Sequence, residues 1–399
     1  MGKKIVKKCK GLPLAVKTLG GLLRHKYNVR DWGNILKSKI WELREDESMI
    51  VPALRVSYHY LPSHLKRCFV YCSLYPKDYH FDKNELILLW MAEDFIQPIE
   101  NYTLEDIGCA YFDELFAMSF FQPSSKDVDL FVMHDLRHDL ATFFAGEFYF
   151  RIKEFENQQK ICNKTRHLSY MVNPNDSSLI LGEACKRAIH MRTFLDVHLV
   201  HRYESIKIEG CSSWLLELDL RCLRVLSFKY FSIELLPDSI EKLIHLHYVD
   251  LSFTPIVELS ESLCKLYNLQ TLKLSYCYKL EMLPSRMQDL LNLRHLDIRG
   301  TDNLKEMPKG MSKLQRLNLL GHYVVGKHEE NGIGELGPID VHGAFRISNL
   351  ENVNNSGEAL EASMGNKKHI TILELKWLPD GDLVDLQTER DILAKFRPH

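Results

Sequence analysis

The sequence lacks the signatures of several protein classes. No apolar run approaches the roughly 18 residues of a membrane-spanning helix, and the first ten residues hold no apolar segment long enough for a signal peptide. The ten cysteines include no pair at the two-residue spacing of a zinc knuckle or a redox motif. These absences favour a soluble cytoplasmic protein whose cysteines are reduced and serve as small core residues.

The chain also lacks a charge bias. Lys and Arg number 51 against 53 Asp and Glu, so there is no general attraction to nucleic acid or to an anionic membrane. Its 399 residues suffice for about two to three domains, and 26% charged with 45% apolar residues is typical of a globular protein. Binding partners must therefore be sought in local patterns.

One apolar pattern recurs along the second half of the chain. Triplets of apolar residues with gaps of two and one return at steps of 23, 23, 24 and 21 residues, within the range of roughly 20–29 of leucine-rich repeats. In each copy the alternation places three apolar side chains on one face of a short strand. Stacked copies bury these faces, which predicts an α/β solenoid with a concave binding surface. The copies are Leu223-Leu226-Phe228, Leu246-Val249-Leu251, Leu269-Leu272-Leu274, Leu293-Leu296-Ile298 and Leu314-Leu317-Leu319.

We predict that the repeats occupy residues 165–399, after a polar linker over 153–164. Irregular first repeats precede the regular copies, which span 223–320. A glycine-rich insertion over 321–345 interrupts the period before Ile370-Leu373-Leu375 restores it. An open solenoid end would expose core, and no polar closing repeat follows, so we expect a truncated C-terminus.

The region before the repeats predicts helices and a hairpin. Residues 1–60 are expected to be all helical, with Pro13 in the first turn of one helix and Asp31 and Ser48 as caps of the next two. Residues 61–152 are expected to form a winged-helix domain. With the helical segment before it and the solenoid after it, the chain is predicted to be a multidomain α+β protein. Its helices are expected over 63–74, 82–96 and 103–118, its hairpin from 120–122 and 130–133, and a helix over 134–144 and a strand over 148–152 should follow.

Four short motifs stand before the repeats in a fixed order. They are Gly11-Leu12-Pro13-Leu14-Ala15, Cys68-Phe69-Val70-Tyr71-Cys72-Ser73-Leu74-Tyr75-Pro76, Leu88-Leu89-Trp90-Met91-Ala92-Glu93 and Met133-His134-Asp135-Leu136. With the repeats, they closely resemble plant nucleotide-binding leucine-rich-repeat (NB-ARC-LRR) disease resistance proteins of the coiled-coil subclass. The resemblance implies that residues 1–60 end the helical subdomain beside a nucleotide site, that 61–152 form the winged-helix domain, and that the rest is the sensor.

The resemblance also implies roles for single residues. The Pro of the first motif lies against the bound nucleotide in that family, which points to Pro13, with Gly11 and Leu12 beside it. The His of Met-His-Asp contacts the β-phosphate of ADP in the resting state, which points to His134. An imidazole that donates to a phosphate makes a charge-assisted bond and would sense whether the winged helix is docked. Asp135 would support the switch by accepting free backbone N–H groups at the helix start.

The phosphate-binding sequence of the family is missing. No Gly-x-x-x-x-Gly-Lys-[Ser/Thr] occurs, nor does the acidic strand that binds Mg²⁺. One phosphate contact contributes roughly 1.5–3 kcal/mol, whereas micromolar binding needs about 8 kcal/mol. We therefore expect a chain truncated at its N-terminus that neither hydrolyses ATP nor binds ADP tightly, although a full-length parent would bind ADP or ATP. Because no other catalytic constellation is evident, the sequence predicts no enzyme.

Two specific functions of the winged helix, zinc binding and nucleic-acid binding, are less well supported than ordinary structural roles for the same residues. His134 and His138 lie one helical turn apart, as in zinc proteases, but Asp135 replaces the Glu and no third ligand is evident. We predict no metal site and take His138 as a solvated helix residue. The third helix carries Glu105 and Asp106 but no Lys or Arg, which argues against nucleic-acid binding.

The residues between the apolar members of the repeats are expected to face the concave surface. They combine aromatic and charged side chains, which suit a protein partner and also an inhibitory contact with the winged helix. The candidate partner-binding residues are Arg224, Lys229, Tyr248, Asp250, Lys273, Tyr276, Arg294, Asp297 and Arg299.

Two functions fit these patterns. The first is a plant immune receptor in which the repeats recognise a pathogen effector, or a host protein that it modifies, and bias the winged helix in an ADP/ATP-dependent switch. The alternative is a stand-alone leucine-rich-repeat interaction adaptor without nucleotide switching, in which the winged helix only caps the repeats. A change of ADP exchange upon His134→Ala would separate them.

Overall fold

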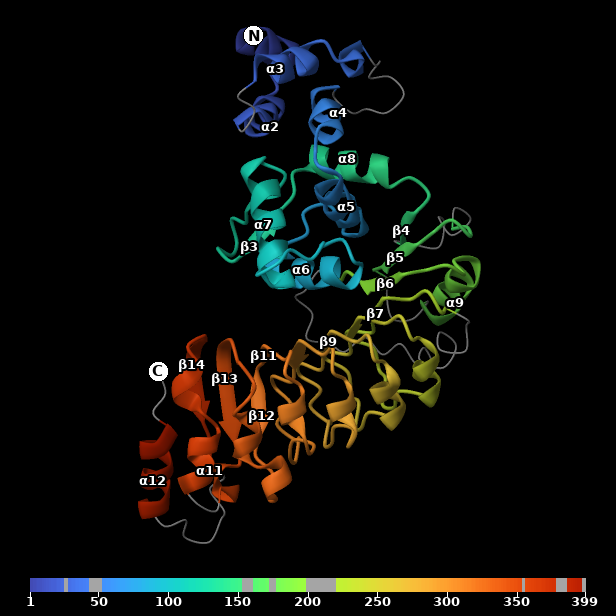
Figure 1. The fold of residues 1–399 in the computed structure, drawn as a ribbon. Coiled ribbons are helices and arrows are strands. Elements are labelled where there is room, and N and C mark those ends of the chain that lie inside the picture. Colours follow the sequence, from blue (N-terminus) through green and yellow to red (C-terminus); the bar gives the residue numbers. More distant parts are fainter. Residues whose placement is uncertain are drawn as a thin grey trace. The chain divides into compact units, whose positions relative to one another are not determined.

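The computed structural model describes eight stretches of the chain, which divide into two compact units (Figure 1). The first unit holds the described residues before the linker together with 161–170 and 197–198, and the second holds the described residues from 171 onward apart from these. The predicted winged helix thus lies in the first unit and the regular repeats lie in the second. The described residues are 1–24, 28–42, 52–152, 161–171, 177–198, 220–353, 356–377 and 386–396.

The first unit starts with a small helical core. The indole N–H of Trp41 donates to the carbonyl of Ile35 (2.7 Å) within it, and the apolar faces of the helices pack together as their periodicity predicts. The helices are α1 (Gly2–Lys8), α2 (Pro13–Arg24), α3 (Val29–Leu36), the 3-10 turn η1 (Lys39–Glu42) and α4 (Pro52–His59). The buried core residues are Ile5, Cys9, Ala15, Leu19, Leu22, Leu23, Ile35, Ala53 and Val56.

The cap of α3 differs from the prediction. The Asn28 side chain accepts a hydrogen bond from the N–H of Arg30 (2.9 Å), and Asp31 lies inside the first turn. The prediction of Asp31 as the cap is wrong because the helix already begins at Val29, after the extended backbone of Asn28 that a cap needs. The predicted cap Ser48 lies outside the described residues.

Three helices follow in the predicted order. They are α5 (Ser63–Tyr71) with its 3-10 continuation η2 (Cys72–Leu74), α6 (Lys83–Ala92) and α7 (Leu104–Ala117). Asp82 caps α6 by accepting from the N–H of Glu85 (2.9 Å), and Thr103 with Asp106 forms the reciprocal capping box of α7. Helix α6 ends earlier than predicted, because Asp94 adopts a left-handed backbone (φ 56°) that stops it.

Two cysteines belong to the core of this domain, as predicted. Cys68 and Cys72 are both 0% exposed. Burial raises the pKa of both thiols, so they stay protonated at neutral pH and act as small apolar side chains.

The wing is a three-stranded antiparallel sheet in the order β1-β3-β2. The strands are β1 (Phe81–Asp82), β2 (Gln122–Pro123) and β3 (Leu130–Val132). The predicted hairpin is confirmed, because β2 pairs with β3 and places Gln122 opposite Val132. The sequence does not predict β1, since two residues are too few to show an alternation.

A helix and two paired strands complete the first unit. Helix α8 (Asp135–Ala145) and strand β4 (Tyr149–Ile152) lie where a helix and a short strand are predicted. Strand β4 pairs in parallel with β5 (His167–Tyr170), and the rings of Tyr149 and His167 stack 4.3 Å apart. His167 Nδ1 also lies 3.5 Å from the buried carboxylate of Glu93 at the end of α6. This pair ties β5 to the winged-helix domain.

The second unit contains one parallel strand per repeat (Figure 1). The apolar members of the first four predicted copies are all fully buried, which confirms stacked leucine-rich repeats. After α9 (Ser177–Arg187) the strands are β6 (Thr193–Asp196), β7 (Val225–Ser227), β8 (Tyr248–Asp250), β9 (Thr271–Lys273), β10 (His295–Asp297) and β11 (Leu319–Leu320). The 3-10 turns between them are η4 (Asp238–Lys242), η5 (Glu261–Lys265), η6 (Met287–Asp289) and η7 (Met311–Lys313).

The fifth repeat has a different register from the predicted one. Strand β11 pairs with β10 so that Leu320, not Leu319, lies opposite the buried Leu296. Leu320 is fully buried, whereas Leu319 is half-buried. The fifth copy therefore uses Leu317 and Leu320, and the predicted triplet that starts at Leu314 is shifted by three residues. Leucines satisfy the pattern in both registers, and strand pairing selects one of them.

Beyond Leu320 the chain forms a second parallel sheet, in the order β12-β13-β14. The stretch 321–345, predicted as an insertion, contains a strand, two 3-10 turns and the start of the next strand, much as a regular repeat does. Among the described helices, none combines the length and the apolar character that crossing a bilayer requires. The elements are β12 (His322–Val324), η8 (Glu329–Asn331), η9 (Ile333–Leu336), β13 (Gly343–Ser348), η10 (Leu350–Asn352), α11 (Ser356–Glu361), η11 (Met364–Asn366), β14 (Ile370–Leu375) and α12 (Leu386–Phe396).

Candidate functional site

The first predicted site residues lie where α2 begins. Gly11 has a φ of +80°, a left-handed conformation that favours glycine and that separates α2 from α1. Pro13 is the first residue of α2, as predicted, where its missing N–H leaves no helical hydrogen bond unmade. Gly11 and Pro13 are exposed, and Leu12 packs partly against the helical core. The start of α2 therefore presents Pro13 at the surface.

The second predicted site residue, His134, caps helix α8. Its Nδ1 accepts a hydrogen bond from the N–H of Leu136 (3.2 Å). In the neutral ring the proton is then on Nε2, which can donate to an external acceptor because His134 is exposed. The capping role predicted for Asp135 is wrong, since His134 occupies the cap and Asp135 is an exposed residue of the first turn.

One helix packs against both helices that carry these residues. Helix α4 packs against α2 and also against α8. Both helices belong to the first unit. Helix α4 therefore lies between the helix that begins at Pro13 and the helix that His134 caps.

The next turn of α8 is buried, contrary to the prediction for His138. His138 is 3% exposed, and its Nε2 lies 2.7 Å from the carbonyl oxygen of Tyr75, to which Arg151 also donates. Burial lowers the pKa of His138 and keeps the ring neutral. Arg137 is 0% exposed, with its guanidinium 4.1 Å from the ring centroid of Phe120. The solvated interpretation of His138 is wrong because α8 packs against α5 and η2.

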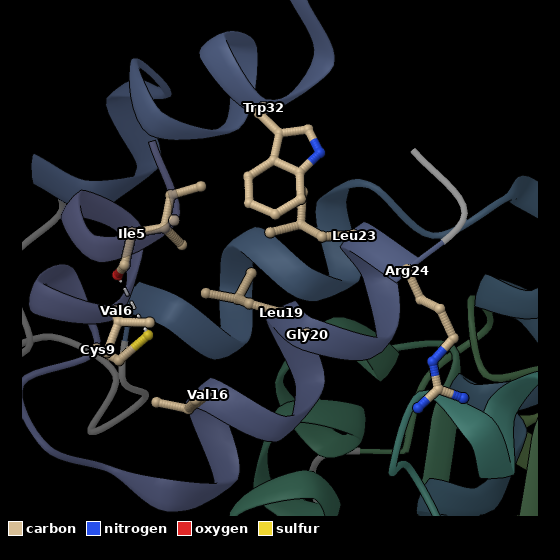
Figure 2. Close-up of a pocket in the computed structure, with 10 residues that line it drawn as sticks. Ile5, Val6, Cys9, Val16, Leu19, Gly20, Leu23, Arg24 and Trp32 are labelled. Atoms are coloured by element: carbon tan, nitrogen blue, oxygen red, sulfur yellow. Dashed lines mark hydrogen bonds between the residues drawn. The ribbon is translucent and has the colours of Figure 1, made fainter. Parts of the chain in front are cut away.

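A cavity of about 370 Å³ lies among α1, α2 and α3 (Figure 2). Apolar side chains line it, and Arg24 is its charged residue. A phosphate needs converging donors, so this lining does not suit a nucleotide phosphate. Neither Pro13 nor His134 belongs to the lining, which consists of Gly2, Ile5, Val6, Cys9, Val16, Leu19, Gly20, Leu23, Arg24 and Trp32.

The repeats align equivalent strand positions in rows, one residue from each repeat. Neighbouring strands pair without a shift from β7 to β10, so the third strand residues lie side by side. That row is Ser227, Asp250, Lys273 and Asp297. The row two positions later in the chain is Lys229, Ser252, Ser275 and Arg299.

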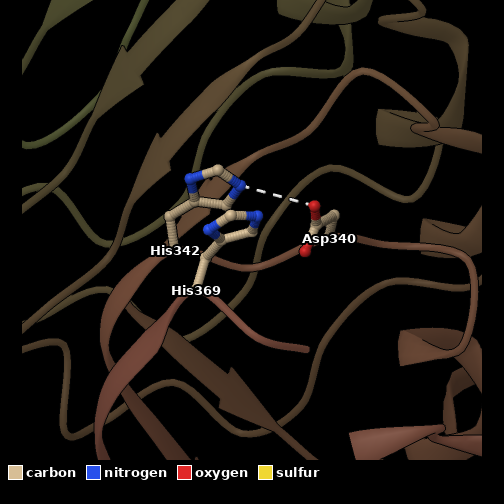
Figure 3. Close-up of side chains that lie close together, drawn as sticks. All are labelled: Asp340, His342 and His369. Atoms are coloured by element: carbon tan, nitrogen blue, oxygen red, sulfur yellow. Dashed lines mark ion pairs between the residues drawn. The ribbon is translucent and has the colours of Figure 1, made fainter. Parts of the chain in front are cut away.

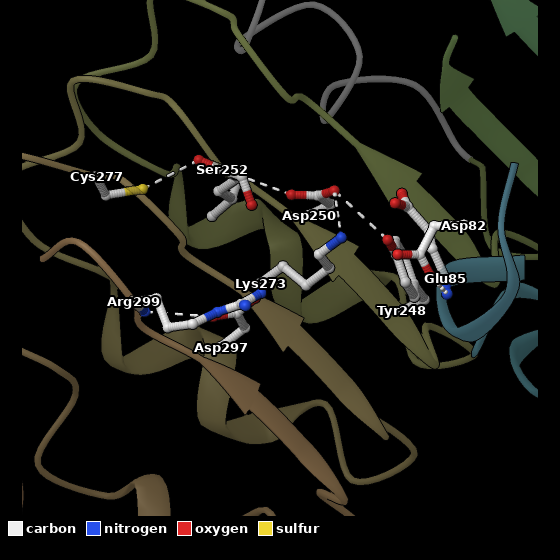
Figure 4. A network of polar contacts seen from close by, with 10 residues as sticks. Asp82, Glu85, Tyr248, Asp250, Ser252, Lys273, Cys277, Asp297 and Arg299 are labelled. Atoms are coloured by element: carbon white, nitrogen blue, oxygen red, sulfur yellow. Dashed lines mark hydrogen bonds and ion pairs between the residues drawn. The ribbon is translucent and has the colours of Figure 1, made fainter. Parts of the chain in front are cut away.

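Asp250 is at the centre of a polar network in these rows (Figure 4). Its carboxylate accepts from the N–H of Ser252 (2.9 Å) and from the hydroxyl of Tyr248 (3.4 Å). The ammonium of Lys273 lies 3.7 Å away. These contacts compensate for the burial of the carboxylate.

Asp297 forms a second charged pair one strand further on. Its two oxygens accept from the guanidinium of Arg299, at 2.8 Å and 2.6 Å. Burial acts to raise the pKa of Asp297, but the hydrogen bonds and charge of Arg299 outweigh burial and hold the pKa below its ordinary value. The Asp297 carboxylate therefore stays ionised at neutral pH.

The nine predicted partner-binding residues divide by exposure. The prediction that Tyr248, Asp250 and Asp297 lie on an exposed surface is wrong. They are 0%, 1% and 3% exposed and take part in the polar contacts just described. Tyr276 and Arg299 are exposed, and Arg224, Lys229, Lys273 and Arg294 are half-buried.

A stacked aromatic row, formed by Tyr230, Phe253 and Tyr276, flanks the polar rows. Successive rings are 4.7 Å and 4.8 Å apart, at interplanar angles of 25° and 18°. The three residues have φ values of 66°, 61° and 59°, which bulky side chains rarely adopt. The next position of the row is Gly300, where a Cβ would lie 2.5 Å from the ring of Tyr276.

Only Tyr276 of the aromatic row is among the predicted partner-binding residues. Tyr230 and Phe253 stand at the same offset as Tyr276, two residues after the last apolar member of each copy. Comparing the copies position by position would have found them. Lys229 adds a cation to the row, since its Nζ lies 5.3 Å from the ring centroid of Tyr230 and 5.9 Å from that of Phe253.

Comparison with known families matches both parts of the chain. The family described as the disease resistance protein winged helix domain matches residues 74–141. A leucine-rich repeat region matches residues 205–394. The two matches correspond to the winged helix of the first unit and the stacked strands of the second.

Similar proteins match along the whole chain. Disease resistance RPP13-like protein 1 of Arabidopsis thaliana is 40% identical over 409 residues, covering 100% of this chain and 38% of that protein. Disease resistance protein RGA2 of Solanum bulbocastanum is 38% identical over 402 residues, again covering 100% of this chain and 38% of that protein. The chain thus spans less than half the length of these relatives. On its winged helix, its repeats and this similarity, the chain belongs to the plant disease resistance proteins that carry a winged helix and leucine-rich repeats.

Proposed function

We propose that this chain is the regulatory and recognition region of a plant immune receptor. Its repeats bind a protein, which is a pathogen effector or a host protein that the effector modifies. Binding biases the winged-helix domain and so regulates an ADP/ATP-dependent switch. The receptor acts in the cytoplasm, where nucleotides are available and cysteine thiols stay in the reduced state.

The aromatic row is the observation that carries the recognition part of this proposal. Stacked rings lose little conformational freedom when a partner binds, and aromatic residues are enriched at protein interfaces. Tyr276 is 54% exposed, with Lys229 and Arg299 in the neighbouring row. A rigid aromatic surface flanked by cations suits a protein partner with apolar and acidic side chains.

The cap of α8 supports the nucleotide-sensing part. His134 offers one exposed N–H on Nε2, a donor that fits a phosphate oxygen of ADP. Pro13, exposed at the start of α2, offers an apolar contact. One donor and one apolar contact contribute far less than the roughly 8 kcal/mol of micromolar binding. We therefore propose that these residues sense a nucleotide and that this chain alone does not hold it tightly.

An exchange experiment tests the sensing part. The chain replaces the matching region of RGA2, and release of a fluorescent ADP analogue is followed after dilution. His134→Ala should speed release by about 10–100-fold, because it removes a charge-assisted hydrogen bond of roughly 1.5–3 kcal/mol. His245→Ala, at an exposed histidine of the repeats, is the matched control and should leave release unchanged. Equal release rates in wild type and His134→Ala would contradict the sensing role.

A cell-death assay tests the recognition part. Pathogen effectors are screened in leaf tissue that expresses the receptor carrying this region, and the responding effector is retained. Tyr276→Ala should reduce the response, because it removes the exposed end of the aromatic row. Tyr267→Ala is the control, since Tyr267 is 64% exposed but lies outside that row. A response that falls equally in both variants, or in neither, would count against the aromatic row as the recognition surface.

A further inference from the structure

We propose that Asp340, His342 and His369 form a binding site for a divalent transition-metal ion, with Zn²⁺ as the best match (Figure 3). The three side chains each offer one ligand atom, and these atoms all lie within 4.8 Å of one another. Two imidazoles and one carboxylate are a donor set that zinc accepts, with water in the remaining position. This site goes beyond the receptor function and does not depend on it.

Two neighbouring strands hold the histidines side by side. His342 directly precedes β13 and His369 directly precedes β14, two strands that pair in parallel with Gly343 opposite Ile370. The N–H of Gly343 donates to the carbonyl of His369 (2.9 Å) and fixes this level of the pair. The two imidazole rings consequently stack, 4.2 Å apart at an interplanar angle of 24°. The sheet therefore sets the spacing of the two backbone positions that carry the imidazoles.

Asp340 supplies the third ligand from the same edge. It stands two residues before His342, which places the two side chains on one side of an extended backbone. An Oδ2 of Asp340 lies 3.4 Å from Nε2 of His342. Zinc bonds of about 2.0–2.1 Å in a tetrahedral site put two ligand atoms about 3.3 Å apart. The Asp340–His342 spacing is close to this value, and all ligand atoms lie within 4.8 Å of one another, so rotations of the exposed side chains can bring the three atoms into place.

A buried lysine holds the two segments that carry the ligands. Lys367 is 4% exposed, and its ammonium donates to the carbonyls of Leu336 (2.8 Å) and Ile339 (2.5 Å). Ile339 precedes Asp340, and Lys367 lies two residues before His369. The lysine thus fastens the strand entry of β13 to that of β14, which preorganises the ligands before an ion binds.

A zinc titration of the whole chain tests this site. Wild-type protein should bind one Zn²⁺ by isothermal titration calorimetry, and saturating Zn²⁺ should raise its midpoint of thermal unfolding. His342→Ala and His369→Ala should each weaken binding by at least about tenfold, and Asp340→Asn should weaken it less. His245→Ala is the matched control, because His245 is also exposed but lies far from the three ligands in the sequence. This variant should bind Zn²⁺ as wild type does. If the double variant His342→Ala/His369→Ala binds Zn²⁺ as tightly as wild type, the site is refuted.

X-ray absorption of the zinc-loaded wild-type protein gives a test that needs no variant. The spectrum should show nitrogen and oxygen ligands, with the scattering of two imidazoles. Sulfur scattering at about 2.3 Å would instead place the ion on cysteines, such as the exposed Cys222, and would overturn the proposal.

Discussion

The Nε2 atom of His138 lies 2.7 Å from the carbonyl oxygen of Tyr75, which ties α8 to the residue that follows η2. The carbonyl accepts, so the neutral ring must donate its Nε2–H. The Arg151 guanidinium donates to the same oxygen, and its positive charge disfavours protonation of His138. The docking of α8, which His134 caps, therefore depends on a histidine that stays neutral.

Acid should loosen this docking. Burial lowers the pKa of His138 in the folded protein from its ordinary 6.5. The unfolded chain then binds more protons below pH 6.5, so the contribution of His138 to stability is complete above that pH and is lost as pH falls. The midpoint of thermal unfolding of the first unit should drop between pH 7 and 5, and His138→Gln, which keeps an N–H donor but does not titrate, should show a smaller drop. An equal drop in both proteins would assign the acid sensitivity to other groups.

Replacing Arg137 by a long apolar side chain should stabilise the protein. Burial lowers the pKa of Arg137 to about 9, so the group is charged at neutral pH while 0% exposed. Within the described residues none of its guanidinium nitrogens has a hydrogen-bond partner. Arg137→Met should raise the free energy of unfolding by about 1–3 kcal/mol in urea denaturation. Arg67→Met, at an exposed guanidinium over the Phe95 ring, should change it by less than about 0.5 kcal/mol.

A loss of stability in Arg137→Met would show that the guanidinium contributes through its contact with Phe120. That contact is a cation–π interaction at 4.1 Å, worth about 2 kcal/mol when desolvated. A double-mutant cycle of Arg137→Met and Phe120→Leu separates this contribution from the cost of burying the charge.

Adding a methyl group at the end of the aromatic row should be costly. Gly300 has a φ of +71°, and a Cβ there would lie 2.5 Å from the ring of Tyr276. Gly300→Ala should lower the midpoint of thermal unfolding, with a loss of about 1–3 kcal/mol. Gly33→Ala is the matched control, because Gly33 lies inside α3 with nothing within 4 Å of the added Cβ. There the same change should stabilise by about 0.5–1 kcal/mol. A neutral Gly300→Ala would mean that the tyrosine ring moves aside freely.

Removing the carboxylate of Glu93 should destabilise the first unit strongly. Its side chain is 0% exposed, and one oxygen lies 3.5 Å from Nδ1 of His167. Glu93→Ala leaves buried polar partners behind and should cost about 3–5 kcal/mol, whereas Glu93→Gln should cost less because its amide oxygen still accepts. Glu100→Ala, at an exposed carboxylate, should cost less than about 0.5 kcal/mol. Circular dichroism during urea denaturation measures all three variants. A small loss of stability in Glu93→Ala would show that the Glu93–His167 pair does not hold β5 against the winged-helix domain.

Features that depend on local chemistry could be predicted from the order of residues alone. Leucines at a near-constant spacing predict the stacked strands, because each copy can bury its apolar face only against a neighbour. The capping residues Asp82 and Thr103 mark the starts of α6 and α7, since a carboxylate or a hydroxyl accepts backbone N–H groups within one turn. The order of four motifs before the repeats identifies the family. None of these inferences needs a contact between distant residues.

Which distant residues meet depends on packing and strand pairing. Strand pairing selected Leu320 over Leu319 for the core, although both satisfy the apolar pattern. Packing of α8 against α5 buried His138, because a helix of mixed character does not reveal which polar residue faces the core. The neighbouring histidines His342 and His369 meet because parallel strands place residues a whole repeat apart side by side. Such contacts depend on repeat length and strand register, which are settled by packing and backbone hydrogen bonds and not by local sequence.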